Sequence, residues 1–229
     1  KPDGRSIGYA IAGPLLFAFS QWVLDQARAS GVDRLYFLAR EGQFLKMVYD
    51  RVALDVPDAP PSAYLVVSRR ALNVPAIKTP DDALSIAGSH YGPGPLEDFM
   101  LERFGLAMDD ELWQLLRDKG LWEKGQMVEV SAAGMGRLPK VLEALLPAIL
   151  AQGEHERPAL MEYLARMGLG QDERHAVVDV GFSGTIQRGL NSLLGGRIDG
   201  SYMATLANAM RVERQFGVTA LGAYYHAAP

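Results

Sequence analysis

Apolar positions along the chain follow two kinds of pattern. Short runs of mainly apolar residues, typical of strands buried in a parallel sheet, lie at 34–39, 63–67, 175–180, 200–207 and 218–227. Helices are expected at 7–29, 42–54 and 185–194, because the first ends at a glycine and the others show helical spacing or follow a Gly-rich turn. This alternation predicts an α/β fold, a Rossmann-like three-layer sandwich with a mainly parallel sheet of about five strands.

The middle of the chain has a different pattern, with helical pieces interrupted by Gly and Pro. It contains one short apolar run at 126–130 and two expected helices at 138–150 and 158–167. We therefore interpret residues 75–170 as a mostly helical insertion or cap. Residues 1–74 and 171–229 would form the Rossmann-like α/β core.

Composition narrows the class of protein. The chain has 229 residues, 48% of them apolar, and a formal net charge of −4. The acidic balance argues against nucleic acid as a partner, since nucleic-acid surfaces are basic. The absence of cysteine excludes disulfides, zinc–thiolate sites and cysteine nucleophiles, and it favours a cytoplasmic location.

Two features of the sequence bear on whether a membrane or further domains lie next to this chain. Residues 7–24 carry no charge, and we expect them to form a buried helix packed against the sheet, not a membrane span. Because the chain begins at Lys1, we also expect it to be a piece of a longer protein, with flanking domains among its partners.

The first candidate for chemistry lies where a buried strand ends at Asp179 and a Gly-rich turn leads into a helix. A helix N-terminus offers free N–H groups and a positive dipole end. Gly181 and Gly184 would let the backbone approach a ligand, while Ser183 and Thr185 would donate to phosphate oxygens. In the alternative interpretation, Ser183 caps the helix and Asp179 accepts hydrogen bonds from the turn.

A second loop follows the first strand and contains Arg40, Glu41 and Gly42. Arg40 could bind phosphate in a bidentate manner, with Gly42 in the same turn, and Glu41 could bind a metal or act as a base. The alternative is a structural ion pair between Arg40 and Glu41.

A third loop, with Ser68, Arg69 and Arg70, follows the second strand. Since the carboxyl ends of parallel strands meet at one edge of the sheet, all three loops are expected to surround one phosphate-binding site. Asp179 is the expected ligand for Mg²⁺, and Asp179 and Glu41 are the candidate catalytic groups.

These segments also resemble a known family. The sequences GPLLFAFSQWVLDQA, LYFLAREG, YLVVSRRAL and VVDVGFSGTIQ, with a looser match at 200–203, are similar to a HAD-like (haloacid dehalogenase-like) region of bacterial surface-polysaccharide biosynthesis proteins, which often carry glycosyltransferase modules. Glu41 stands where that family usually has Asp, and no DxD pair follows a strand. The resemblance implies a hydrolase-type or phosphoryl-transfer setting with a sugar phosphate or sugar nucleotide as ligand.

The order of the motifs is also similar to that of type I phosphoribosyltransferases, in which an acidic strand end leads into a turn that binds the ribose phosphate. Here Val178 replaces the first acidic residue of that turn. Three hypotheses follow: a HAD-like phosphate-ligand domain, a phosphoribosyltransferase-like enzyme, and a non-catalytic scaffold that docks neighbouring modules.

Overall fold

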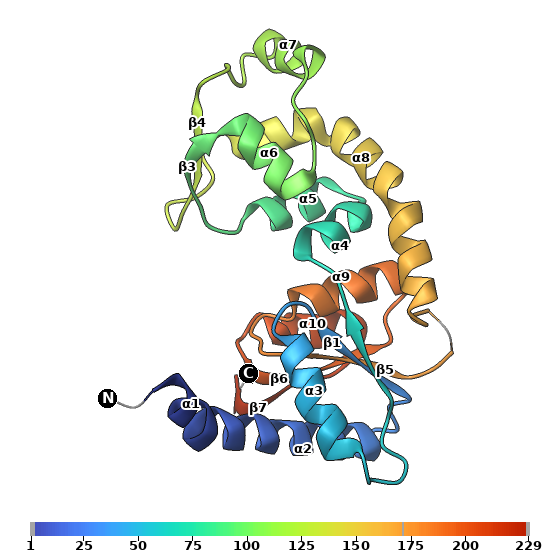
Figure 1. Ribbon diagram of the computed structural model, residues 1–229. Coiled ribbons are helices and arrows are strands. Elements are labelled where there is room, and N and C mark those ends of the chain that lie inside the picture. Colours follow the sequence, from blue (N-terminus) through green and yellow to red (C-terminus); the bar gives the residue numbers. More distant parts are fainter. Residues whose placement is uncertain (1–2, 171, 228–229) are drawn as a thin grey trace. The chain divides into compact units, whose positions relative to one another are not determined.

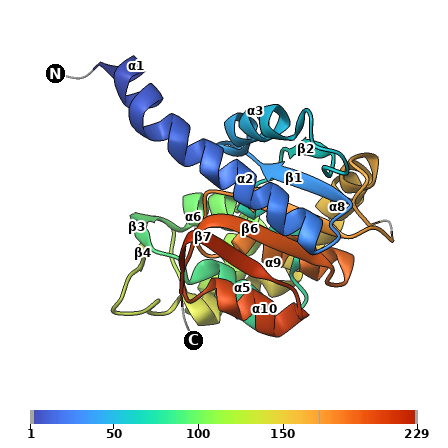
Figure 2. The same cartoon turned by 90° about the horizontal axis from the view of Figure 1, so that it is seen from below.

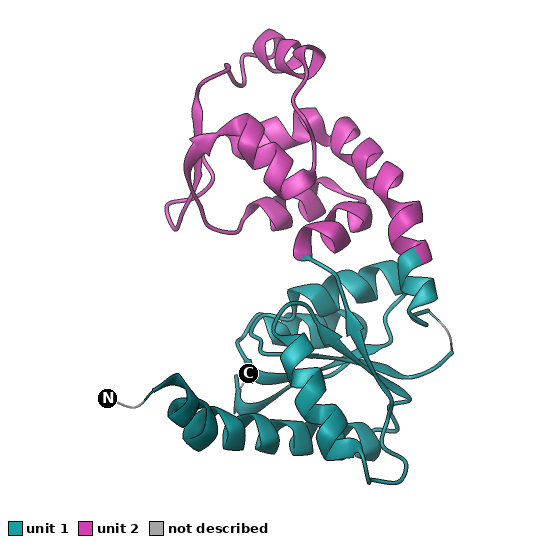
Figure 3. Ribbon diagram, viewed as in Figure 1, with its two compact units in different colours: residues 1–68, 163–229 teal, residues 69–162 magenta. Residues whose placement is uncertain are grey.

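The computed structural model describes residues 3–170 and 172–227 (Figure 1). The chain divides into two compact units, residues 1–68 with 163–229 and residues 69–162 (Figure 3). The first unit thus comes from two separate parts of the sequence, and the second is inserted between them. The boundaries differ from the expected 74/75 and 170/171 because helix α4 and most of helix α8 belong to the second unit.

The first unit is built on a parallel five-stranded sheet with the order β2-β1-β5-β6-β7. The strands are β1 (Arg34–Leu38), β2 (Ser62–Leu65), β5 (His175–Asp179), β6 (Ile198–Thr205) and β7 (Ala220–His226). The prediction of a parallel α/β sheet is confirmed. The central strands β1 and β5 are almost entirely buried, which is why they appear in the sequence as mainly apolar runs.

Helices cover both faces of this sheet. Helices α2 (Gly13–Ala29) and α3 (Gly42–Ala53) lie on one face, and α9 (Thr185–Leu194) and α10 (Ala209–Phe216) lie on the other (Figure 2). Helix α3 buries Leu45 and Tyr49 against Phe37 of β1 and leaves Phe44 and Met47 exposed. The result is the expected three-layer Rossmann-like arrangement.

The second unit has its own apolar core and a two-stranded antiparallel sheet. Its elements are α4 (Arg69–Ala76), α5 (Pro80–Ala87), β3 (Tyr91–Pro95), α6 (Leu96–Phe104), α7 (Asp110–Asp118), β4 (Met127–Val130) and α8 (Leu138–Arg166). The two expected helices at 138–150 and 158–167 are one helix, and that prediction was wrong. Pro158 lies inside α8, whose residues Val141, Leu145 and Ile149 pack into the core.

The N-terminal helix also differs from its prediction. It begins with α1 (Gly4–Ile7), continues through one π-helical turn (Gly8–Ala12, η1) and ends as α2. The expected buried helix exists only in the second half of α2, where its buried residues are Phe19, Ser20, Val23, Leu24 and Ala27. Before Phe19 the helix lies largely in solvent.

Candidate functional site

The loops that follow β1 and β5 lie next to each other because these two strands are hydrogen-bonded neighbours. From β1 the chain continues to β2 on one side, and from β5 it continues to β6 on the other side. The helices that follow, α3 and α9, lie on opposite faces of the sheet (Figure 2). Open α/β sheets bind ligands at such a switch point, outside the carboxyl ends of the two strands.

The β1 loop presents two charged side chains to solvent. Arg40 and Glu41 are both exposed, and Glu41 Oε2 accepts a hydrogen bond from the Arg40 backbone N–H at 3.3 Å. The backbone N–H groups of Glu41 and Arg40, together with the Arg40 charge, lower the pKa of the Glu41 carboxyl. Among the described residues Arg40 has no ion-pair partner, so the alternative of a structural pair with Glu41 is not realised, and the guanidinium is available to an anion.

Gly42 has a steric role in the same turn. It is buried at the start of α3, and a Cβ atom there would lie 2.7 Å from the backbone carbon of Phe37. Only glycine lets α3 begin this close to the end of β1. The expected phosphate-binding position is therefore first of all a packing position.

The β5 loop is fixed to the end of β6. The Ala204 N–H donates to the Val180 carbonyl at 3.3 Å, and the Leu206 N–H donates to the Phe182 carbonyl at 2.9 Å. A Cβ atom at Gly181, whose φ is +139°, would lie 2.4 Å from the Ala204 carbonyl oxygen. Gly181 is thus required for the close approach of this loop to β6.

Asp179 ends β5 and is half-buried at the base of this loop. Its Oδ1 accepts a hydrogen bond from the Val180 N–H at 2.8 Å, as the alternative interpretation of a turn-accepting carboxylate predicted. The carboxylate also acts on its surroundings, because its charge adds to burial in raising the pKa of Tyr202.

Helix α9 begins without a side-chain cap. Gly184 precedes it in the left-handed conformation, at φ 64°, and no side chain of the described chain forms a cap hydrogen bond there. The alternative role of Ser183 as a helix cap is therefore not realised. Ser183 is half-buried beside the helix N-terminus, and Thr185 is the first helical residue, so the first-turn N–H groups of α9 and two hydroxyls lie at one place.

A buried polar network fixes α9 to the sheet, and sequence reasoning missed it. The Gln187 amide Nε2 donates to the carbonyls of Ile198 and Thr219 at 2.9 and 2.7 Å, and its Oε1 accepts from the Tyr202 hydroxyl at 3.0 Å. A Cβ atom at Gly200 would lie 2.5 Å from Gln187 Oε1. No local pattern of the sequence pairs Gln187 with Gly200 or Tyr202, because they lie in separate segments that only the folded sheet brings together.

The third expected loop is divided between the two units. Ser68 is exposed at the end of the first unit, while Arg69 and Arg70 begin α4 in the second. Arg70 forms a bidentate ion pair with Glu156 of α8, at 2.5 and 3.2 Å. This pair corrects the expectation that Arg70 binds phosphate, because its guanidinium is already bound within the second unit. Arg69 is exposed on α4.

The acidic residues at the switch point are few. Within residues 3–170 and 172–227, no group of three or more His, Cys, Asp or Glu side chains could hold a metal ion. Mg²⁺ is commonly bound by one or two carboxylates together with substrate phosphates. That substrate-dependent mode of binding needs no more carboxylates than Asp179 and Glu41.

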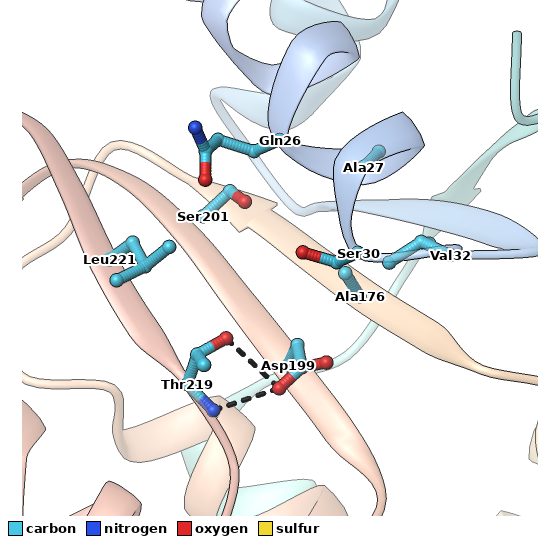
Figure 4. A pocket seen from close by; sticks show the side chains of 9 residues that line it. All are labelled: Gln26, Ala27, Ser30, Val32, Ala176, Asp199, Ser201, Thr219 and Leu221. Atoms are coloured by element: carbon cyan, nitrogen blue, oxygen red, sulfur yellow. Dashed lines mark hydrogen bonds between the residues drawn. The ribbon is translucent and has the colours of Figure 1, made fainter.

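A small pocket lies at the opposite, amino end of the strands (Figure 4). Gln26 of α2 and Ser30, which follows the end of α2, line it together with Asp199 and Thr219. Asp199 Oδ1 accepts hydrogen bonds from the Thr219 N–H and hydroxyl at 2.8 and 2.9 Å, and Oδ2 forms an ion pair with Arg174 at 3.5 Å. Its carboxylate is thus already bound, and the pocket is separate from the switch-point loops.

Fold and site together define the first unit as a Rossmann-like α/β domain with a polar, glycine-containing switch point. Comparison with known proteins adds no closer assignment: no family model matches the chain, and no curated protein gives a significant match.

Proposed function

We propose that the first unit binds a phosphorylated small molecule, a sugar phosphate or sugar nucleotide, at the β1/β5 switch point. The observation that carries this proposal is the pairing of an exposed, unpaired Arg40 on the β1 loop with the uncapped N-terminus of α9 on the neighbouring β5 loop. Arginine and a helix N-terminus are the two groups that proteins use most directly for phosphate. Ser183 and Thr185 would donate further hydrogen bonds to the phosphate oxygens.

The HAD-like and phosphoryl-transfer part of the proposal concerns Asp179 and Glu41. A carboxylate at the end of β5 is well placed to hold Mg²⁺ together with ligand phosphate, and Glu41, whose pKa is lowered, is ionised at neutral pH. The domain would act in the cytoplasm, in the setting of bacterial cell-surface polysaccharide synthesis that the sequence resemblance implies.

A thermal-shift panel tests the proposal. The full chain is mixed with sugar phosphates, sugar nucleotides and phosphoribosyl pyrophosphate, each with and without Mg²⁺. A ligand at 100 times its Kd should stabilise the fold by about 2.7 kcal/mol. Arg40→Ala should reduce the shift, whereas Arg51→Ala, an exposed change in the last turn of α3, should not.

The panel also separates the alternatives. A response to phosphoribosyl pyrophosphate alone, lost in Asp179→Asn, would favour the phosphoribosyltransferase-like reading. No response to any phosphate compound would remove the proposal.

A second candidate function is that of a docking module for flanking domains. Its observation is an apolar rim at the same edge, where Val66, Phe182 and Leu206 are exposed directly after β2, in the β5 loop and after β6. Exposed apolar groups that gather at one edge are typical of interaction surfaces. Leu206→Asp should weaken such docking and leave a phosphate-induced thermal shift unchanged, so the two functions can be told apart.

A further inference from the structure

The first part of the N-terminal helix exposes apolar side chains that the fold does not use. The helical segment Gly4–Ala29 is long and apolar enough to cross a membrane by length and composition. Yet only 22% of its apolar 18-residue stretch is buried. Tyr9 is 87% exposed and Ile11 is 66% exposed. Ile7, Leu15 and Phe17 are exposed as well. Figures 1 and 2 show this end of the helix extending away from the sheet.

Exposed apolar side chains lie on most sides of this part of the helix, while Leu16 packs against the core of the first unit. Residues 14–18 are five consecutive apolar residues (PLLFA), and consecutive helical residues point about 100° apart, so together they cover the whole circumference. A helix that docks in one protein groove shows a single apolar stripe, whereas an all-round apolar helix is typical of a lipid or fully buried environment. The segment therefore fits a surrounding medium better than a single protein face.

Charge along the helix agrees with a lipid environment. No charged side chain occurs between Ile7 and Leu24, which matches uncharged hydrocarbon. Arg5, exposed one turn before the apolar segment, supplies a cation that complements lipid phosphate groups. The backbone polar groups within the segment are satisfied by the helix itself, as a lipid environment requires.

The apolar surface continues onto the neighbouring strand. The Tyr224 hydroxyl donates a hydrogen bond to the Leu15 carbonyl, and the Tyr224 ring lies beside Phe19. Tyr224 and Tyr225 at the end of β7 are both exposed. Tyrosine is enriched at the level of lipid headgroups, where its ring is apolar and its hydroxyl is hydrated.

The free part of the helix is too short to span a bilayer. The contacts of Leu15 and Phe19 with Tyr224 hold the helix to the sheet, and residues 4–14 measure about 16 Å at 1.5 Å per residue. The hydrocarbon core is about 30 Å thick. We propose that residues 4–18 lie within one leaflet of a phospholipid bilayer, along its surface, with Arg5 and Tyr224 at the headgroups.

Vesicle flotation of the full chain tests this proposal. Vesicles of phosphatidylcholine with one-fifth phosphatidylglycerol should carry the protein to the top of the gradient. Ile11→Asp should reduce this partitioning by about tenfold or more, since a carboxylate is costly in the apolar layer. Leu54→Asp, at an equally exposed apolar position just after α3, should float like the unchanged protein.

A second measurement does not depend on the flotation variant. Tyr9→Trp adds a fourth tryptophan, and its emission, taken as the difference from the unchanged chain with three tryptophans, should be blue-shifted with the vesicles and quenched by brominated acyl chains. Absence of flotation together with an unshifted emission would overturn the proposal. So would a lipid-free dimer that Ile11→Asp dissociates, because a second copy would then be the partner of this helix.

Discussion

The Tyr202 hydroxyl donates a hydrogen bond to Gln187 Oε1 at 3.0 Å, and both side chains are completely or almost completely buried. Through this bond β6 holds the first turns of α9, the helix whose N-terminus forms half of the candidate site. Gly200 leaves room for the Gln187 amide. Gln187 from one segment of the sequence therefore packs together with Gly200 and Tyr202 from another.

Removing the hydroxyl should destabilise the first unit. Tyr202→Phe leaves Gln187 Oε1 buried without its donor, at an expected cost of about 1–3 kcal/mol in the free energy of unfolding. Urea unfolding followed by circular dichroism measures the change. Tyr64→Phe, a half-buried tyrosine of β2, serves as the control, and an equal loss in both variants would contradict the importance of this bond.

Glycine at position 181 should be replaceable only at a large cost. Gly181→Ala places a Cβ atom 2.4 Å from the Ala204 carbonyl at a φ of +139°, and we expect a loss of at least about 2 kcal/mol. Gly195→Ala is the matched control, with φ at +80° but no atom of the described residues within 4 Å of the new Cβ. It should cost only about 1 kcal/mol, from backbone conformation alone. Equal losses in chemical denaturation would mean that close approach to β6 is not the constraint.

Arg70 should matter for the stability of the second unit and not for ligand binding. Arg70→Met breaks the pair with Glu156, whose carboxylate also accepts from Gln152 at 2.6 Å, so we expect a loss of about 1 kcal/mol. Arg69→Met, an exposed change next to it, should lie within about 0.5 kcal/mol of the unchanged chain. A thermal shift with a phosphate ligand that disappears in Arg70→Met would restore Arg70 to the binding site.

His175 should make the stability of the first unit depend on pH. The imidazole is buried beside the Tyr36 ring, neither ring nitrogen has a hydrogen-bond partner among the described residues, and burial lowers its pKa below 6.5. Nearby Arg34 lowers this pKa further, while Glu173 and Asp33 oppose the shift. The unfolded chain therefore binds the proton more readily than the folded chain.

The sign of the effect follows from this difference. Stability is complete above about pH 6.5, the ordinary value for histidine, and declines as the pH falls below it, until the folded protein is itself protonated. Urea midpoints between pH 8 and 5 should fall less steeply in His175→Gln than in the exposed control His155→Gln. Parallel pH profiles for the two variants would exclude His175 as the source.

The sequence by itself determined the strands of the sheet and the loops that follow them. Mainly apolar runs such as 34–39 can be read locally in the sequence, because a strand buried on both faces favours apolar residues on both sides. The same local reasoning located the turn around Gly181 and Gly184 and the helix that begins at Thr185. It could not reveal whether α2 is covered along its whole length.

Only the tertiary structure decided which polar groups are already bound. Arg40 and Arg70 look alike in the sequence, because each lies beside another charged residue after a strand. Glu156, which lies far along the chain, forms an ion pair with Arg70 and not with Arg40. The strand order likewise brings β1 beside β5 across the inserted unit. Pairing between distant residues depends on how the elements pack together, and a local pattern of apolar and polar residues does not record it.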